Sequence, residues 1–162
     1  MNTKDIAGTL ATLFSELVDG APSAPAYMLN AGDQGLLRSL DKLSATTASS
    51  QTATGSSIAA HVDHVRYGLS LMNRWSEGEN PFTDADWSAS WKKTTVSDDE
   101  WRRLRADLRA ETTRWLNALR TPREVRELEL NEIIGSIAHL GYHLGAIRQI
   151  NSSLRGPAAG TA

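Results

Sequence analysis

The sequence contains no cysteine among its 162 residues. This absence excludes disulfide bonds, thiolate metal ligands and a catalytic cysteine nucleophile. Long apolar runs are also missing, and no stretch approaches the roughly 20 residues needed to span a bilayer. The net charge is only -2, so no extended basic surface would attract nucleic acid or an anionic membrane. We therefore expect neither of these partners, and expect a small molecule as the substrate.

The first residues, MNTKDIAGTL, lack the basic start and the continuous apolar core of a signal peptide. We therefore expect a cytoplasmic protein. Its length fits one domain with its own core. We expect residues 1–152 to form this domain and residues 153–162, which are mostly small and polar, to be a flexible tail.

Apolar residues at helical spacing predict four long helices and one short one. The long helices cover about 3–19, 57–77, 97–121 and 125–151, and the short one covers about 33–43. Residues 44–57 have the composition of a linker, and residues 78–96 that of a long connection. No strand pattern is present. The sequence therefore predicts an all-α protein, a four-helix bundle with a long connection between the second and third long helices.

The chain has four histidines, and all of them fall on two predicted helices. His139 and His143 are four residues apart, so their side chains are neighbours on one helix face and can share a metal ion. A third histidine from a facing helix would complete an open three-histidine site, and His61 and His64 are both on the apolar half of 57–77. Spacing alone leaves open which of them it is, and whether the histidines bind metal or only pack. Nitrogen ligands without cysteine favour Zn²⁺, Ni²⁺ or Fe²⁺.

Two motifs resemble those of the DinB-like superfamily, which includes the YfiT-like metal-dependent hydrolases. The stretch SSIAAHVDHVRYGL is similar to the family's second-helix pattern Thr-Val-x-x-x-x-His-His-Leu-Ala, and HLGYHLGAIRQI to its last-helix pattern His-x-x-x-His. Aligning Ser57 and Ile58 with the family's Thr-Val places His64 at the metal position, with Asp63 where the family often has a histidine. The resemblance covers about residues 30–152 and implies a four-helix bundle with His64, His139 and His143 as metal ligands. By the same alignment His61 is not a ligand.

The resemblance implies an enzyme but not one reaction. Some family members transfer a low-molecular-weight thiol, and a protein without cysteine would have to take its thiol from outside, so we favour transfer of such a thiol to a small electrophile. A metal-dependent hydrolase and a non-catalytic metal-binding bundle are the alternatives. Hydrolysis needs a general base, and the two candidates, Asp63 and Glu132, are better explained as solvated helix carboxylates. No catalytic residue is therefore assigned.

Two further expectations concern the surface. Trp87 and Trp91 lie four residues apart in the long connection. We expect them to dock onto the bundle, and covering the mouth of the histidine site is the alternative. Formation of a homodimer through a helical face is compatible with the sequence, which does not say which face would be used.

Overall fold

The computed structural model describes residues 1–53 and 55–158. Within these ranges the chain forms six α-helices and no β-strand, which confirms the all-helical class. Three short 3-10 turns, η1 to η3, accompany them. The helices are α1 (Ala7–Asp19), α2 (Gly35–Asp41), α3 (Ala45–Ala48), α4 (Ile58–Ser76), α5 (Asp98–Arg120) and α6 (Glu127–Ile150).

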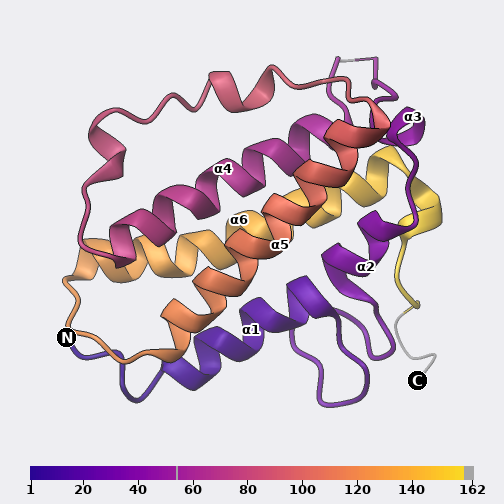
Figure 1. The fold of residues 1–162 in the computed structure, drawn as a ribbon. Coiled ribbons are helices and arrows are strands. Elements are labelled where there is room, and N and C mark those ends of the chain that lie inside the picture. The colour runs from indigo at the N-terminus through magenta and orange to yellow at the C-terminus, as the bar shows by residue number, and fades with distance from the viewer. Residues whose placement is uncertain (54, 159–162) are drawn as a thin grey trace.

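The four longest helices, α1, α4, α5 and α6, pack into one bundle (Figure 1). Helix α4 contacts both α5 and α6, and α1 contacts the same two helices. Each of these helices buries a stripe of apolar side chains at helical spacing, although Ile134, which the spacing places on the α6 stripe, is 48% exposed. On α5, for example, that stripe is Trp101, Leu104, Leu108, Trp115 and Leu119. Burial of these faces in one shared core holds α4 against α6, and these are the two helices that carry the histidines.

Capping residues determine where α4 and α5 begin. Ser57 accepts a hydrogen bond from the backbone of Ala60 and begins α4, and Ser97 and Glu100 form a capping box at the start of α5. Helix α1 begins later than predicted, at Ala7, because the residues before it pair with another part of the chain. The backbone of Thr3 donates to the carbonyl of Arg123, in the connection between α5 and α6.

The connection between α4 and α5 runs along α4 (Figure 1). It contains two 3-10 turns, η1 (Pro81–Thr83) and η2 (Ala89–Trp91), and both contact α4. Side chains of α4 and its cap hold the connection in place: the Ser57 hydroxyl donates to the carbonyl of Thr94, and the backbone of Asp86 donates to the Tyr67 hydroxyl. The connection therefore lies over the histidine-bearing part of α4.

Two segments are more ordered than the sequence indicates. The predicted linker contains α3, where Ser44 caps the helix and Ala45 and Ala48 are buried. In the predicted tail, η3 (Ser152–Leu154) buries Leu154, and the carbonyl of Pro157 accepts a hydrogen bond from Asn30. The polar composition of these segments does not predict their order, because only a few small or apolar residues in each are buried. Thr54 of the linker and residues 159–162 of the tail lie outside the described residues.

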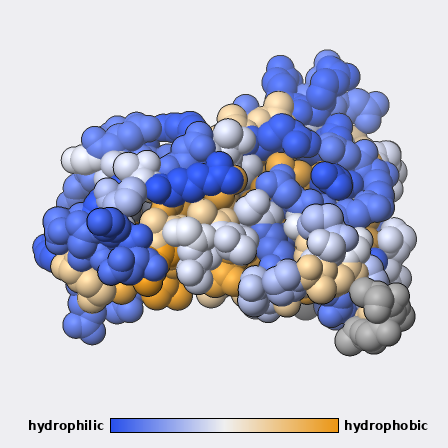
Figure 2. Space-filling view, turned by 90° about the horizontal axis from the view of Figure 1, so that it is seen from below, coloured by the Kyte–Doolittle hydropathy of each residue, from blue (hydrophilic) through white to orange (hydrophobic). Residues whose placement is uncertain are grey.

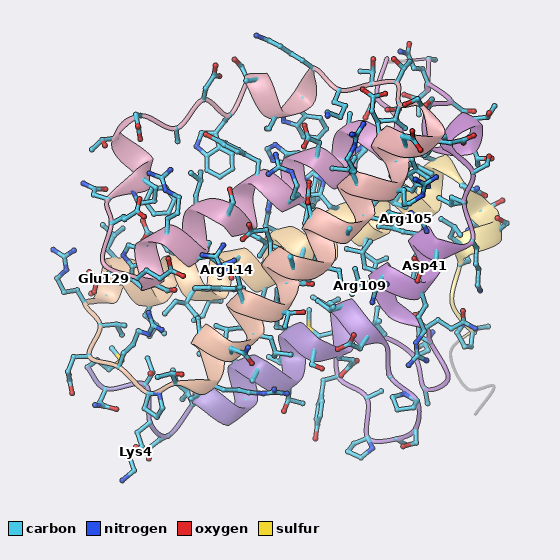
Figure 3. The ribbon with its side chains drawn as sticks, viewed as in Figure 1. Lys4, Asp41, Arg105, Arg109, Arg114 and Glu129 are labelled. Carbon is cyan, nitrogen blue, oxygen red and sulfur yellow. The ribbon has the colours of Figure 1, made fainter. Side chains whose placement is uncertain are left out.

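Charged side chains cover the outside of the bundle and link its elements. Arg105 and Arg109 of α5 both pair with Asp41 of α2 (Figure 3). Arg114 of α5 pairs with Glu77. Seen from the α1 side, the surface is mostly hydrophilic, and hydrophobic residues gather in a patch left of centre (Figure 2). No helix in the described part of the chain is long and apolar enough to cross a membrane.

Candidate metal centre

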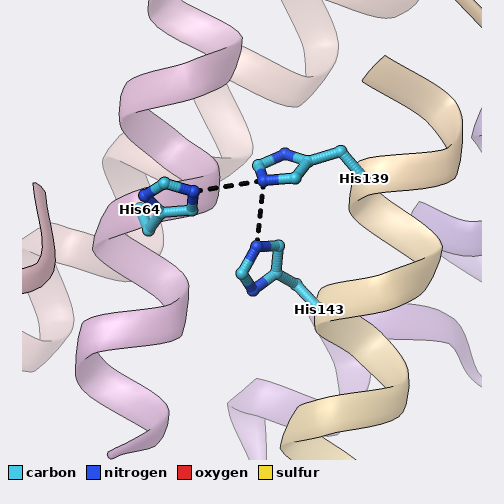
Figure 4. A group of neighbouring side chains, drawn as sticks. All are labelled: His64, His139 and His143. Atoms are coloured by element: carbon cyan, nitrogen blue, oxygen red, sulfur yellow. Dashed lines mark hydrogen bonds between the residues drawn. The ribbon is translucent and has the colours of Figure 1, made fainter. Parts of the chain in front are cut away.

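His64, on α4, faces His139 and His143, on α6 (Figure 4). The Nε2 atom of His139 lies 3.1 Å from Nε2 of His64 and 2.9 Å from Nε2 of His143. Each of the three residues offers one ring nitrogen, and all of these atoms lie within 4.8 Å of one another. The structure thus brings together the three histidines predicted as a metal site.

The two distances from Nε2 of His139 to the other histidines are close to those around a divalent transition ion. Zn–N bonds of about 2.0–2.1 Å in a tetrahedral site place two nitrogens roughly 3.3 Å apart. The two short contacts, at 2.9 and 3.1 Å, would need to lengthen by only a few tenths of an ångström. His64 and His143 are buried, and His139 is partly exposed. Three neutral nitrogen ligands with one open side are the arrangement of a catalytic rather than a structural zinc site.

A serine in the connection fixes the orientation of His64. Nδ1 of His64 lies 2.7 Å from the hydroxyl of Ser90, which itself donates its proton to the carbonyl of Trp87. Because a hydroxyl has one proton, His64 is the donor to Ser90. Neutral His64 therefore carries its proton on Nδ1 and presents the lone pair of Nε2 to the cluster. Outer partners of this kind are typical of metal-binding histidines.

His61 contacts the cluster from its outer side. Its Nδ1 lies 2.8 Å from Nδ1 of His143, and its Nε2 lies 2.9 Å from the hydroxyl of Ser56. When Nε2 of His143 faces the cluster as a lone pair, Nδ1 of His143 is the donor to His61. His61 then donates from Nε2 to Ser56. His61 is in contact with His143 but does not belong to the converging group.

Burial keeps the imidazoles neutral. The pKa of His143 is lowered to about 3, first by burial and then by its histidine neighbours, and the pKa of His64 is lowered to about 4 in the same way. Burial also lowers the pKa of His61 and of His139. A neutral imidazole is the form that binds a metal, so protons compete weakly for this cluster near neutral pH.

Both tryptophans of the connection dock onto the bundle, and they do so over the histidines. The ring of Trp91 stacks on His64 with centroids 4.4 Å apart, and it meets His61 edge-on at 5.1 Å. Trp87 lies 5.6 Å from the His64 ring. The sequence left two alternatives for these tryptophans, docking onto the bundle or covering the histidine site. The structure combines them, because the tryptophans dock onto the bundle at the histidines.

The two candidate bases occupy different surroundings. Asp63 is 8% exposed and pairs with Arg66 at 2.9 Å, so the expectation of a solvated carboxylate is wrong for this residue. The Asp63 carboxylate is held in this ion pair, which makes it a poor candidate for a general base. Glu132 is partly exposed and lines the same cavity as His139.

Two cavities adjoin the cluster. One, of about 210 Å³, is lined by His139 and has apolar walls made by Val65, Leu69, Met72, Trp87 and Leu140. The other, of about 670 Å³, is more polar and is lined by His61, Ser56, Thr94, Tyr142 and Gln149. Among the described residues, His139 of the three-histidine cluster lines the smaller cavity, and no member of the cluster lines the larger one. The open side of the cluster therefore faces the smaller, apolar cavity.

Sequence reasoning missed Ser56 and Ser90. Both lie in polar segments that resemble linkers, and their contacts with His61 and His64 depend on where those segments dock. No periodic pattern includes Ser90, so the sequence alone does not predict its contact with His64.

Comparisons of the chain with protein-family models, with curated proteins and with solved structures gave no match.

Proposed function

We propose that this protein is a metal-dependent enzyme of the DinB-like type. In this proposal His64, His139 and His143 hold one divalent transition ion (Zn²⁺, Ni²⁺ or Fe²⁺), and the protein transfers a low-molecular-weight thiol to a small electrophile. The observation that carries the proposal is the convergence of three Nε2 atoms from two helices, with neutral imidazoles and with outer hydrogen bonds on His64 and His143. The order and spacing of the two histidine motifs support the same reading.

The chemistry follows from an open three-histidine site. A bound metal ion with a free position lowers the pKa of a coordinated thiol or water and so supplies a nucleophile at neutral pH. The chain has no cysteine, so the thiol must be a second substrate. In the transfer a sulfur–carbon bond forms, the leaving group departs with its electron pair, and the thiol proton passes to solvent. The chain's own residues orient the ligands, exclude water around His143 and present the open side at His139.

Hydrolysis is a second candidate, and one observation favours it. The Glu132 side chain lines the same cavity as His139, so a carboxylate is available on the open side of the cluster. A general base must come within hydrogen-bond reach of the water that it activates. Glu132 is a candidate for this base because it lines the same cavity as His139.

Metal content is the first test. Untagged wild-type protein and the His139→Ala variant are incubated with Zn²⁺ or Ni²⁺, desalted and analysed by elemental mass spectrometry. We expect one equivalent of metal in the wild type and its loss in the variant. No metal in the wild type would overturn the proposal and leave the histidines as parts of a packed bundle.

Activity is the second test. Metal-loaded protein is incubated with monochlorobimane and one of several thiols (cysteine, glutathione, bacillithiol or mycothiol), and formation of the fluorescent conjugate is followed. We expect a metal-dependent rate with at least one thiol, absent in His139→Ala. Glu132→Gln separates the two candidate reactions: it leaves thiol transfer unchanged, but it abolishes ester hydrolysis if that is the activity.

A further inference from the structure

We infer that the 210 Å³ cavity beside His139 is the binding site for an uncharged aromatic or short branched aliphatic group of the electrophile. This inference rests on the proposed function, because it takes the open side of the metal site as the place where the substrate reacts. Three features of the cavity carry it: its walls, its size and the two glycines that keep it open.

The cavity walls select an apolar group. Val65, Leu69, Met72, Leu140 and the Trp87 ring supply most of the surface. The Ser136 hydroxyl also lines the cavity, but it donates to the carbonyl of Ile133 and accepts from Trp115, so it has little capacity left for a ligand. Glu132 remains as the charged wall residue, and a carboxylate at that place disfavours an anionic group. An uncharged apolar group is the one that these walls stabilise.

The volume sets the size of the group. An apolar cavity of about 150 Å³ holds one benzene molecule. The cavity of about 210 Å³ therefore accommodates one aromatic ring or a branched chain of similar size, with room for the bond that leads to His139. A whole thiol cosubstrate of the kind that carries a sugar or a peptide would extend beyond this cavity.

Two glycines on facing helices keep the cavity open. Gly68 of α4 and Gly135 of α6 both line it. A Cβ atom at Gly68 would lie 3.4 Å from Cζ3 of Trp87 and 3.7 Å from Cε1 of His139, and a Cβ atom at Gly135 would meet nothing within 4 Å. Glycine inside a helix is less stable than alanine. The glycine at position 68 leaves vacant the space between Trp87 and His139, where the substrate group would approach the metal.

The test uses two hydroxamates that share one metal-binding group and differ in their apolar part. Binding of acetohydroxamate and benzohydroxamate to Zn²⁺-loaded protein is measured by isothermal titration calorimetry. We expect benzohydroxamate to bind at least tenfold more tightly. In Gly68→Ala the added methyl fills space beside His139, so this advantage falls below threefold while the Kd of acetohydroxamate stays unchanged. Gly145→Ala is the matched control, since it is on α6, its added Cβ meets nothing within 4 Å and it does not line this cavity.

The outcomes separate this inference from the proposed function. Equal affinity for the two hydroxamates, or an advantage that survives in Gly68→Ala, overturns the cavity assignment and leaves the metal site intact. If the protein takes up no Zn²⁺, the proposed function fails, and the cavity is then judged on metal-free protein by NMR. Shifts of the Gly68 and Gly135 amides and of the Trp87 indole N–H caused by benzohydroxamate, but not by acetohydroxamate, support the cavity. Their absence overturns it.

Discussion

The hydroxyl of Ser90 determines which nitrogen of His64 faces the other histidines. It lies 2.7 Å from Nδ1 of His64, and its own proton is donated to the carbonyl of Trp87. The link joins the long connection to α4, so the docking of the connection and the tautomer of His64 depend on one another. A metal site assembled in this way is already oriented before the metal binds.

Ser90→Ala is therefore expected to weaken metal binding without unfolding the protein. The variant removes the acceptor for the Nδ1 proton of His64, and loss of such an outer partner lowers metal affinity by roughly 10- to 100-fold. The Kd for Zn²⁺, measured by competition with a chromophoric chelator, reports the effect. Ser88→Ala is the control, because Ser88 lies in the same segment and bonds to Asp86 rather than to a histidine. Equal Kd values for the two variants would contradict the role of Ser90.

His61 is expected to behave as a positioning residue and not as a ligand. In His61→Ala the buried Nδ1 of His143 loses its partner at 2.8 Å. An unsatisfied buried polar group costs about 1–3 kcal/mol, so metal-free protein should unfold at a lower urea concentration. The variant should still bind one equivalent of Zn²⁺, with weakened affinity, whereas His143→Ala should bind none. Elemental analysis of both variants checks this, and loss of all metal from His61→Ala would assign His61 to the ligand set.

The stability of the metal-free protein is expected to fall as the pH drops from about 6.5 toward 4. The folded-state pKa of His143 is about 3 and that of His64 is about 4, both below their ordinary value of 6.5. In this range the unfolded chain binds more protons than the folded one, so each such histidine removes up to about 1.4 kcal/mol per pH unit, and above pH 7 neither contributes.

Urea unfolding in EDTA at pH 5 to 8 measures this dependence. Three carboxylates at or near the surface also have a lowered pKa: Asp86, Glu100 and Glu129. They act in the same direction but at lower pH, below about 4.5. His143→Gln should reduce the slope between pH 5 and 6.5, because one titrating group is gone. A flat profile for the wild type in that range would show that the buried imidazoles take up protons in the folded protein as readily as in the unfolded chain.

Part of this site is predictable from the sequence for simple geometric reasons. Four residues make about one helical turn, so the spacing of His139 and His143 predicts that they meet. The choice between His61 and His64 is different, since both lie on the apolar half of α4. It depends on the angle at which α4 faces α6. The resemblance to the DinB-like motif selects His64, and the structure places Nε2 of His64 in the cluster and His61 behind His143.

The contacts made by the connection between α4 and α5 are beyond the reach of periodicity. Residues 78–96 have no repeating apolar pattern, and their position is set by individual bonds such as that from Ser57 to the carbonyl of Thr94. The role of Ser90 follows from such a tertiary contact. The helices themselves are predictable because each buries one stripe, and that stripe is visible in the sequence.

Trp91 is expected to control how fast metal leaves the site. Its ring stacks on His64 with centroids 4.4 Å apart, and it also lines the larger cavity, so it stands between that cavity and the cluster. Trp91→Ala removes this cover and admits solvent to His64. The apolar shell around a metal site governs solvent access, so EDTA should remove Zn²⁺ from the variant at least tenfold faster, as followed by stopped-flow with a fluorescent zinc indicator. Trp75→Ala is the control for loss of a tryptophan away from the histidines, since Trp75 packs near Trp115. Equal removal rates in wild type and Trp91→Ala would mean that metal leaves through the apolar cavity at His139, and that Trp91 serves only to dock the connection.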